Sequence, residues 1–314
     1  MYSPIAFFAF NRPFHTLKTL KYLSKNEAAK ETEIFAFIDG PRNNTELHLI
    51  DNVEKIINSF SNMFKKITIS RSLKNLSADT NIRTGVSDVL SKYKSVIVLE
   101  DDICVSKYFL DYMNKALDKY QNNKEVWHIN GFNFPYKSNL SNETFFTRSM
   151  ECWGWGTWED RWFRFQNDPL STDPFYLISK FSKKDIREFN LDLKHNLYWS
   201  MVLANSDGRL PNTWDIFWYA FIFMHNGLCL APRISLTRNI GHDGSGTHSE
   251  KDETIMQANI YQSPIIYYPS EIKEDLDALN EMKKYFNKKF NFKTRILNKL
   301  KRFSFVFINF LKKI

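Results

Sequence analysis

The chain has 314 residues, of which 43% are hydrophobic and 16% aromatic, with only ten glycines and ten prolines. This composition excludes a disordered, collagen-like or low-complexity protein and is typical of one large or two smaller globular domains. The formal net charge is +8, but Lys283–Ile314 holds 11 Lys and Arg residues and no Asp or Glu, so residues 1–282 carry −3. A nucleic-acid enzyme carries its positive charge around its site, so this distribution argues against a nucleic-acid partner.

Three cysteines, Cys104, Cys152 and Cys229, are scattered along the chain. Their odd number and spacing argue against a disulfide framework or a structural zinc site, and favour a reducing compartment. The apolar run at residues 5–10 is too short for a signal peptide, so we expect none. No stretch reaches the ~18 apolar residues that a membrane-spanning helix needs.

The first hundred residues alternate between apolar strands and amphipathic helices. The expected strands are 4–10, 33–38, 66–70 and 95–99, and the expected helices are 14–23, 47–60 and 79–93. Such alternation predicts a mostly parallel sheet with right-handed crossovers. We therefore expect an α/β fold in which helices flank a mostly parallel sheet.

Beyond residue 105 the pattern is less regular. We expect helices at 107–120, 183–207 and 214–225 and strands at 126–129 and 228–231. An aromatic block at 145–165 has no clear period, and residues 249–270 look irregular. The final segment, 271–314, is helical by pattern.

The strand at 95–99 runs directly into Glu100, Asp101 and Asp102. Ligands of open α/β sheets bind beyond the carboxyl ends of the strands. Three adjacent acids repel one another unless a cation lies among them. A divalent metal ion that holds a phosphate fits such a cluster; a solvated acidic turn is the alternative.

Two earlier strands end at the same edge, with Asn11-Arg12 and with Asp39. An arginine there can meet a phosphate or a base carbonyl, and an aspartate can accept hydrogen bonds from a ribose or a base. Asp39 begins an Asp-Gly-Pro sequence, which by itself is a common turn. Three strand ends that each offer a suitable group favour a nucleotide site.

A Trp-Gly-Trp-Gly-Thr-Trp motif contains Trp153 and Trp155 and follows Glu151. Glycines between indoles let the backbone approach a ligand while the rings form walls, and sugars stack on such rings. We expect these three residues to contact the sugar or the acceptor. The alternative is a tryptophan-rich corner of the core.

Asp215 lies in an aromatic, apolar segment. Burying a lone carboxylate there is costly unless it is paired or used, and such surroundings raise its pKa toward that of a general base. A helix cap is the alternative. The glycine-rich loop from Gly241 to His248 has the flexibility to fold over a ligand, or it is a plain surface loop.

The C-terminal segment alternates aromatic and aliphatic residues with Lys and Arg. A basic amphipathic helix of this kind is typical of an anionic membrane surface. Packing against the body of the protein and a dimer contact are the alternatives. We expect a cytoplasmic protein that is peripheral on the inner face of the plasma membrane.

Together these motifs resemble those of bacterial GT-A glycosyltransferases of surface-polysaccharide synthesis and, more distantly, the N-acetylglucosaminyltransferase I family. The shared features, in order, are Asn-Arg-Pro, Val-Leu-Glu-Asp-Asp, the tryptophan block with Arg-Trp after it, Trp-Asp, and Asn-Ile-Gly followed by Gly-Thr-His. The resemblance implies a Rossmann-like GT-A domain over residues 1–270. Its nucleotide-sugar-binding half would be 1–105 and its acceptor-binding half 106–270, with the basic tail at 271–314.

The resemblance also implies roles for single residues. Asp102 and His248 would bind Mn²⁺ or Mg²⁺, and Asp215 would be the catalytic base. The donor nucleotide sugar would be held by Asn11, Arg12, Asp39, Arg83, Glu100 and Asp101.

The implied reaction is an inverting, metal-dependent transfer of a hexosyl or N-acetylhexosaminyl group from a nucleotide sugar. The acceptor would be a hydroxyl of a glycan or a lipid-linked oligosaccharide, such as the core of lipopolysaccharide. One alternative is a nucleotidyltransferase that makes the activated sugar, although such enzymes usually carry a glycine-rich basic loop after the first strand. Another is a non-catalytic, membrane-associated carbohydrate-binding protein.

Overall fold

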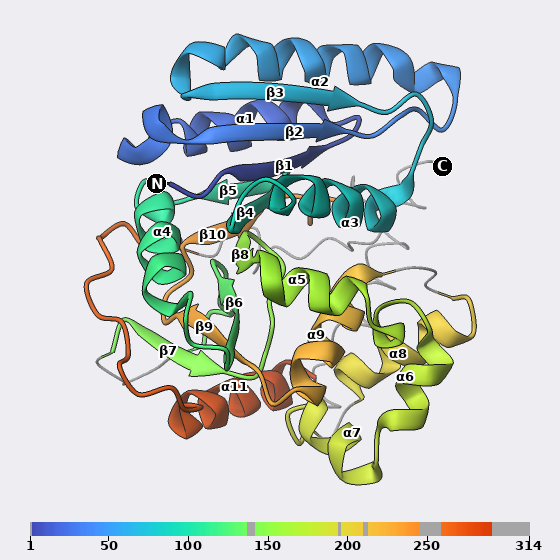
Figure 1. Ribbon diagram of the computed structural model, residues 1–314, viewed down its shortest axis with the longest axis vertical. Helices are drawn as coiled ribbons and strands as arrows, with labels where there is room; N and C mark the ends of the chain where they lie inside the picture. The colour runs from blue at the N-terminus through green and yellow to red at the C-terminus, as the bar shows by residue number, and fades with distance from the viewer. Residues whose placement is uncertain (1, 137–141, 194–195, 210–212, 245–258, 291–314) are drawn as a thin grey trace, which may run out of the picture.

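The computed structural model describes residues 2–136, 142–193, 196–209, 213–244 and 259–290. Its main sheet has eight strands in the order β3-β2-β1-β4-β8-β6-β9-β7, and a second sheet pairs β10 with β5 (Figure 1). The strands are β1 (Ile5–Ala9), β2 (Glu33–Ile38), β3 (Lys66–Arg71), β4 (Ser95–Glu100), β5 (Ile103–Val105), β6 (Val126–Asn130), β7 (Thr144–Thr147), β8 (Trp155–Trp158), β9 (Leu228–Pro232) and β10 (Thr237–Asn239).

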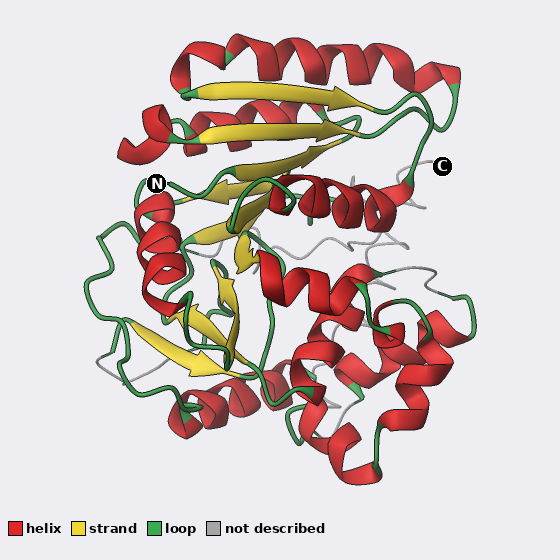
Figure 2. Cartoon of the chain, viewed as in Figure 1, coloured by secondary structure: helices red, strands yellow, loops and turns green. Residues whose placement is uncertain are grey.

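The helices lie on both sides of the main sheet and below it (Figure 2). They are α1 (Pro13–Leu23), α2 (Leu47–Ser59), α3 (Ser77–Leu90), α4 (Phe109–Tyr120), α5 (Glu159–Gln166), α6 (Pro174–Lys180), α7 (Lys183–Phe189), α8 (Leu197–Ser206), α9 (Trp214–Met224) and α11 (Leu276–Lys289). Short 3-10 turns are η1 (Glu27–Glu31), η2 (Asn44–Glu46), η3 (Ser61–Met63) and η4 (Pro169–Ser171).

Strands β1 to β4 are mutually parallel, and β6 is parallel to β9. Within the main sheet, as far as the structure describes it, only β8 and β7 run against their neighbours. The expected α/β class, with a mostly parallel sheet flanked by helices, is therefore confirmed. The parallel strands β1, β2 and β4 bring their carboxyl ends to one edge. There, β4 ends with Glu100, and Arg12 and Asp39 come just after β1 and β2.

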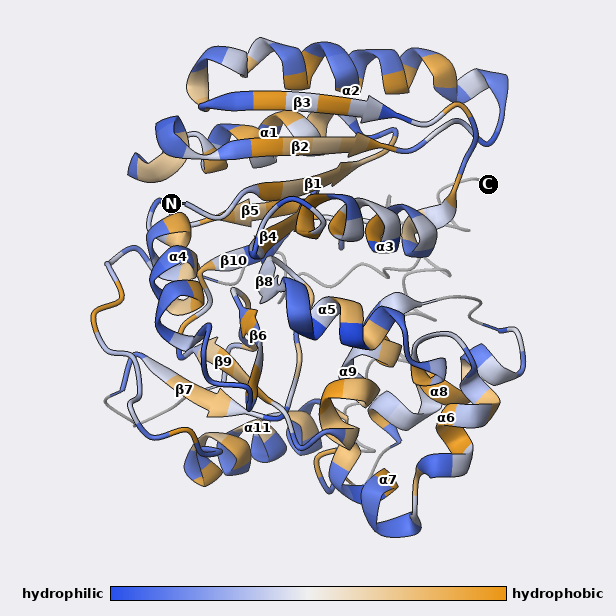
Figure 3. Ribbon diagram, in the orientation of Figure 1, coloured by the Kyte–Doolittle hydropathy of each residue, from blue (hydrophilic) through white to orange (hydrophobic). Residues whose placement is uncertain are grey.

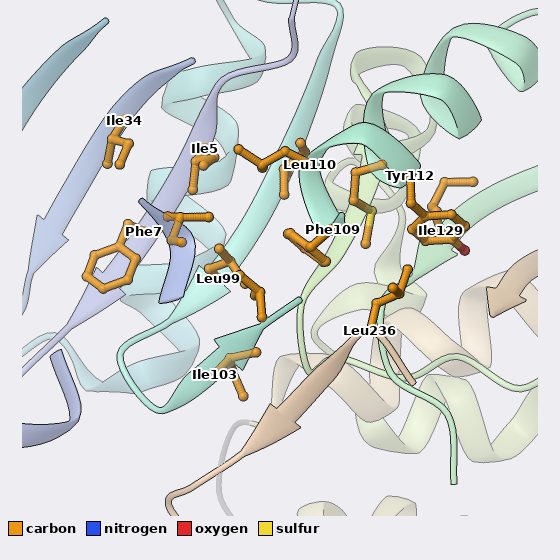
Figure 4. Close-up of a cluster of buried hydrophobic side chains, with 14 of the residues drawn as sticks. Ile5, Phe7, Ile34, Leu99, Ile103, Phe109, Leu110, Tyr112, Ile129 and Leu236 are labelled. Atoms are coloured by element: carbon orange, nitrogen blue, oxygen red, sulfur yellow. The ribbon is translucent and has the colours of Figure 1, made fainter. Parts of the chain in front are cut away.

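Alternate side chains of the central strands enter two different cores. Ile97 and Leu99 of β4 join the cluster that β1 shares with α1, α2 and α4, and Figure 4 shows Leu99 with Phe109 of α4. Val96 and Val98 instead join the cluster formed with α3, α5 and α9. A strand buried on both faces reads as a continuous apolar run, which is why Ser95–Glu100 was visible in the sequence.

The aromatic block at 145–165 resolves into three elements, β7, β8 and α5. Strand β8 is inserted between β4 and β6 and runs antiparallel to both. The two short strands β5 and β10 were also missing from the expected elements. All of these depend on partners far away in the sequence, so the local residue pattern carries little signal for them.

Helix α11 covers β7 at the far edge of the sheet, as Figure 1 shows. Ala278, Leu279, Met282 and Phe286 are buried there, and the preceding Asp275 N–H donates to the carbonyl of Phe146. The described part of the tail expected at 271–314 therefore packs against the rest of the protein, which was one of the two alternatives to a membrane-surface helix. The segment 291–314 lies outside the described residues.

None of the helices in the described ranges combines the length and the hydropathy that a membrane crossing requires.

Candidate active site

The acidic turn after β4 lies at the carboxyl edge of the sheet, between β4 and β5. Asp101 and Asp102 are buried, at 2% and 8% exposed, so the alternative of a solvated turn is excluded. The turn is anchored from α1, because Thr19 Oγ1 donates to the Asp101 carbonyl over 2.8 Å. Burial and the charges of Asp102 and Asp101 raise the pKa of Glu100 from 4.5 to about 8.

Arg12 compensates part of this negative charge. It is the residue before α1, and Nη2 of its guanidinium pairs with Oδ1 of Asp101 and lies 2.8 Å from Oδ2 of Asp102. Burial alone would lower the pKa of Arg12, but the two carboxylates raise it above its ordinary value. The guanidinium that was expected to meet the donor therefore also bridges the acids that were expected to bind a metal ion.

Asp215 lies in the first turn of α9, and Thr213 is the N-cap residue. Oδ1 of Asp215 accepts a hydrogen bond from the N–H of Ile216 over 2.9 Å, and the thiol of Cys152 lies 3.9 Å from Oδ2 of Asp215. Burial raises the pKa of Asp215, which keeps the carboxylate basic. Trp155, which pairs with Val98 of β4, stacks on Trp214 next to Asp215, so α9 and β4 contribute to one acidic site. The Asp215 charge also raises the pKa of Glu100.

Glu151 joins the same site from the segment between β7 and β8. Ser149 Oγ donates to its Oε1 over 2.9 Å, and its N–H donates to Oδ1 of Asn130 over 2.9 Å. Burial raises the pKa of Glu151 to about 8, and the Asp215 charge adds to the shift. This raised pKa favours the protonated form of Glu151, which can donate a hydrogen bond, and Cys152 next to it contacts Asp215.

His128 holds the backbone of Glu151 in place, and the sequence analysis did not identify His128 as part of the site. Its Nδ1 accepts the indole N–H of Trp218 at 3.1 Å, so its Nε2 carries the hydrogen and donates to the Glu151 carbonyl over 3.2 Å. Burial lowers the pKa of His128 to about 3, so the ring is neutral. The signal in the sequence was His128 and Asn130 at alternate positions of an otherwise apolar strand.

The two expected tryptophan contacts have different outcomes. Trp155 is 1% exposed and stacks between Trp214 and His128, with ring centroids 5.1 and 5.0 Å apart. This corrects the expectation that Trp155 contacts a sugar, because neither face of its indole is free. Trp153 is only partly buried, so it stays a candidate for sugar contact.

The loop after β10 lies across the acidic turn. Ile240 N–H donates to the Asp102 carbonyl over 2.8 Å. A Cβ on Gly241 would lie 2.1 Å from Oδ2 of Asp102, so only glycine permits this approach. The His242 ring meets Trp153 edge-on with centroids 5.2 Å apart. The expected ligand His248 lies outside the described residues.

The remaining expected nucleotide contacts lie around this edge with protein partners of their own. Asn11 donates to Glu46 over 3.0 Å. Asp39 accepts the N–H groups of Gly40 and Leu76, each at 2.8 Å, so its carboxylate holds the turn before α3.

Arg83 lies on α3 and is held from two sides. Its Nε donates to Asp79 over 3.0 Å, and its Nη2 donates to the Ser171 carbonyl over 2.7 Å. Helix α3 contacts α9, which carries Asp215, and the Asp79 charge raises the pKa of Asp215. Among the described residues, Nη1 of Arg83 has no hydrogen-bond partner.

The donor set suits a hard divalent cation only in part. Mg²⁺ is commonly held by one or two carboxylates together with substrate phosphates, and Asp101 and Asp102 supply such carboxylates. Within the described ranges, no three His, Cys, Asp or Glu side chains form a complete set of metal ligands. The residues therefore fit a metal ion whose remaining ligands come from a bound diphosphate and water.

Replacing Glu100 with Gln is expected to stabilise the protein at pH 8 and to change little at pH 4. Folding raises the pKa of Glu100 from 4.5 to about 8, so the folded protein binds this proton more tightly than the unfolded chain does. The wild type therefore loses stability as the pH rises from about 4.5 to about 8. Gln carries no charge to bury, and we expect a Tm increase of about 4 °C at pH 8, or about 1–2 kcal/mol. Calorimetry at both pH values measures it.

The matched control is Glu125→Gln, at an exposed site. If the Glu100→Gln variant differs from the wild type by the same Tm at pH 4 and pH 8, the predicted charge effect is contradicted.

Comparison with known proteins gives little guidance. No protein-family model matches the chain, and no curated protein matches it. Among solved structures, a crystal structure of an active-site mutant of LgtC is similar, with a TM-score of 0.38 and 10% sequence identity over 86% of this chain and 88% of that chain.

Proposed function

We propose that the protein is a glycosyltransferase that moves a sugar from a nucleotide-sugar donor to a hydroxyl of a glycan or a lipid-linked oligosaccharide. The observation that carries the proposal is one acidic site built from separate parts of the chain. The turn after β4 brings Glu100, Asp101 and Asp102, and the segment before β8 and the first turn of α9 bring Glu151 and Asp215. Binding alone would not need five carboxylates in one place, of which Asp101 and Asp102 are buried and the others half-buried.

Asp102, with Asp101 beside it, would hold the divalent cation, Mn²⁺ or Mg²⁺, against the donor diphosphate. When bound, such an ion neutralises the charge that develops on the leaving diphosphate. Arg12 adds a fixed positive charge at the same place. Asn11 and Asp39 lie at the ends of β1 and β2, where a nucleoside would extend along the sheet edge.

Asp215 acts as the general base. A bond forms between the acceptor oxygen and the anomeric carbon, and the bond from that carbon to the phosphate oxygen breaks. The hydroxyl proton passes to the Asp215 carboxylate, and the nucleoside diphosphate leaves with the electron pair. The attack comes from the face opposite the leaving group, so the configuration inverts. Burial raises the pKa of Asp215, which makes it a better proton acceptor.

Glu151 orients the sugar. It is protonated at neutral pH, and its O–H donates to a sugar hydroxyl oxygen. Trp153 offers an apolar ring face nearby, and the loop at Gly241 excludes water that would hydrolyse the donor.

The test is to incubate the purified protein with Mn²⁺ and a panel of uridine, guanosine and thymidine diphosphate sugars, and to measure the products. Release of nucleoside diphosphate on addition of a glycan acceptor supports the proposal. Pyrophosphate formed from a nucleoside triphosphate and a sugar phosphate would identify a nucleotidyltransferase instead. Saturable sugar binding without either product would identify a non-catalytic carbohydrate-binding protein.

We also propose that the last residues of the chain hold the protein at the inner face of the plasma membrane. Residues 291–314 contain seven Lys and Arg residues and no acid, interspersed with phenylalanines. Deleting 291–314 keeps α11 and is expected to move most of the protein from the membrane pellet to the supernatant of a cell extract. A Gly-Ser segment of equal length is the control for chain length. Persistence in the pellet would contradict this role.

A further inference from the structure

The outer face of α1 carries a stripe of apolar and basic side chains. Its residues recur at helical spacing on one side of the helix, and they are Phe14, Leu17, Lys18 and Lys21, with Lys25 just beyond the end of the helix. Phe14 is 68% exposed and Leu17 is 42% exposed. The ammonium group of Lys18 lies 5.8 Å from the centre of the Phe14 ring. The opposite face of α1 is buried, and Figure 3 shows the mixed hydropathy of this helix.

The charge of this α1 stripe is entirely positive. Residues 13–26 contain no Asp or Glu. Its lysines form no ion pair with any residue that the structure describes. Some lysines of other helices do form such pairs, for example Lys115 with Asp111 on α4 and Lys284 with Glu281 on α11. A face with unpaired lysines around exposed apolar side chains complements a surface that is negative and apolar beneath.

The α1 stripe also starts at the candidate active site. The residue before α1 is Arg12, which pairs with Asp101 and Asp102. One turn further, His15 lies 3.2 Å from Asp243, in the loop that crosses the acidic turn. A surface that contacts the α1 stripe would therefore lie beside the candidate active site.

We propose that the α1 stripe is a second membrane-contact surface, which lies on anionic phospholipid and holds the carboxyl edge of the sheet beside the bilayer. The lysines attract the anionic headgroups, and Phe14 and Leu17 enter the boundary of the acyl chains. This inference rests on the proposed function, because a lipid-linked acceptor is what gives the enzyme a reason to lie on the membrane. A stable membrane attachment needs two signals, and the α1 stripe supplies one besides the C-terminal segment.

The test measures partitioning of the full-length protein onto vesicles of equal parts phosphatidylglycerol and phosphatidylcholine, with pure phosphatidylcholine for comparison. Lys18→Gln with Lys21→Gln is expected to weaken binding to the anionic vesicles about 30-fold, about fivefold per lysine. Phe14→Ser with Leu17→Ser is expected to weaken it about fivefold or more. Lys115→Gln with Lys119→Gln makes the same charge change on α4 and is expected to have little effect.

Circular dichroism melts show whether each variant folds, and the α1 side chains are exposed enough that the fold should persist. Unchanged binding of the α1 variants, or an equal loss in the α4 control, overturns the proposal. So does equal binding of the wild type to both vesicle types. If the wild-type protein binds neither type of vesicle, the proposal is also overturned, and an acidic protein becomes the better candidate partner for the α1 stripe. The assay needs neither donor nor acceptor, so its failure is distinct from a failure to release nucleoside diphosphate.

Discussion

Replacing Asp215 with Asn is expected to lower turnover about 10²–10⁴-fold and to leave donor binding nearly unchanged, because a positioned general base contributes about that factor. Asn keeps the size and the hydrogen bond to Ile216 but cannot accept the acceptor proton. The measurement is steady-state release of nucleoside diphosphate together with calorimetric titration of the donor. Asp207→Asn, at an exposed ion pair with Arg209 after α8, is the matched control.

The pH dependence should change in the same experiment. Asp215 acts as a base only when it is deprotonated, so wild-type turnover should rise as the pH increases through the pKa of this group. Burial raises the pKa of Asp215 above its ordinary 3.8, so the rise should lie above that pH. The Asn variant should lack this rise. Full turnover in the variant would exclude Asp215 as the base.

Replacing Asp102 with Asn is expected to abolish the metal-dependent part of donor binding. The carboxylate lies at the end of the acidic turn, and its loss removes the anionic ligand and one partner of Arg12. We expect the affinity for a nucleoside diphosphate with Mn²⁺ to fall by at least about 100-fold, the upper end of the loss seen for residues that merely support a metal ligand. Titration calorimetry with and without Mn²⁺ separates the metal-dependent part.

The control for this variant is Asp111→Asn, which removes an aspartate from a surface pair with Lys115 on α4. Metal-stimulated binding that survives in the Asp102 variant would assign the metal ion to other carboxylates. The same titration without the metal ion reports whether Arg12 still holds the diphosphate.

Several features were determined by the sequence alone, because they depend on neighbours within a few residues. The apolar run at 95–99 and the helices around it follow from local periodicity, so the parallel half of the sheet was predictable. The polar groups Arg12, Asp39 and Glu100 lie at the carboxyl ends of strands that run in the same direction, so their meeting at one edge followed from topology.

Only the tertiary structure decided which of the candidate side chains are available. Trp155 and Trp153 are two residues apart in one motif, yet β8 buries Trp155 between Trp214 and His128 and leaves Trp153 partly exposed. The amphipathic pattern of α11 suits a membrane or a protein surface equally, and β7 supplies the partner. The high pKa of Glu151 likewise arises from burial among residues distant in sequence. Burial is a property of long-range packing, and a local pattern cannot tell which apolar partner will cover a side chain.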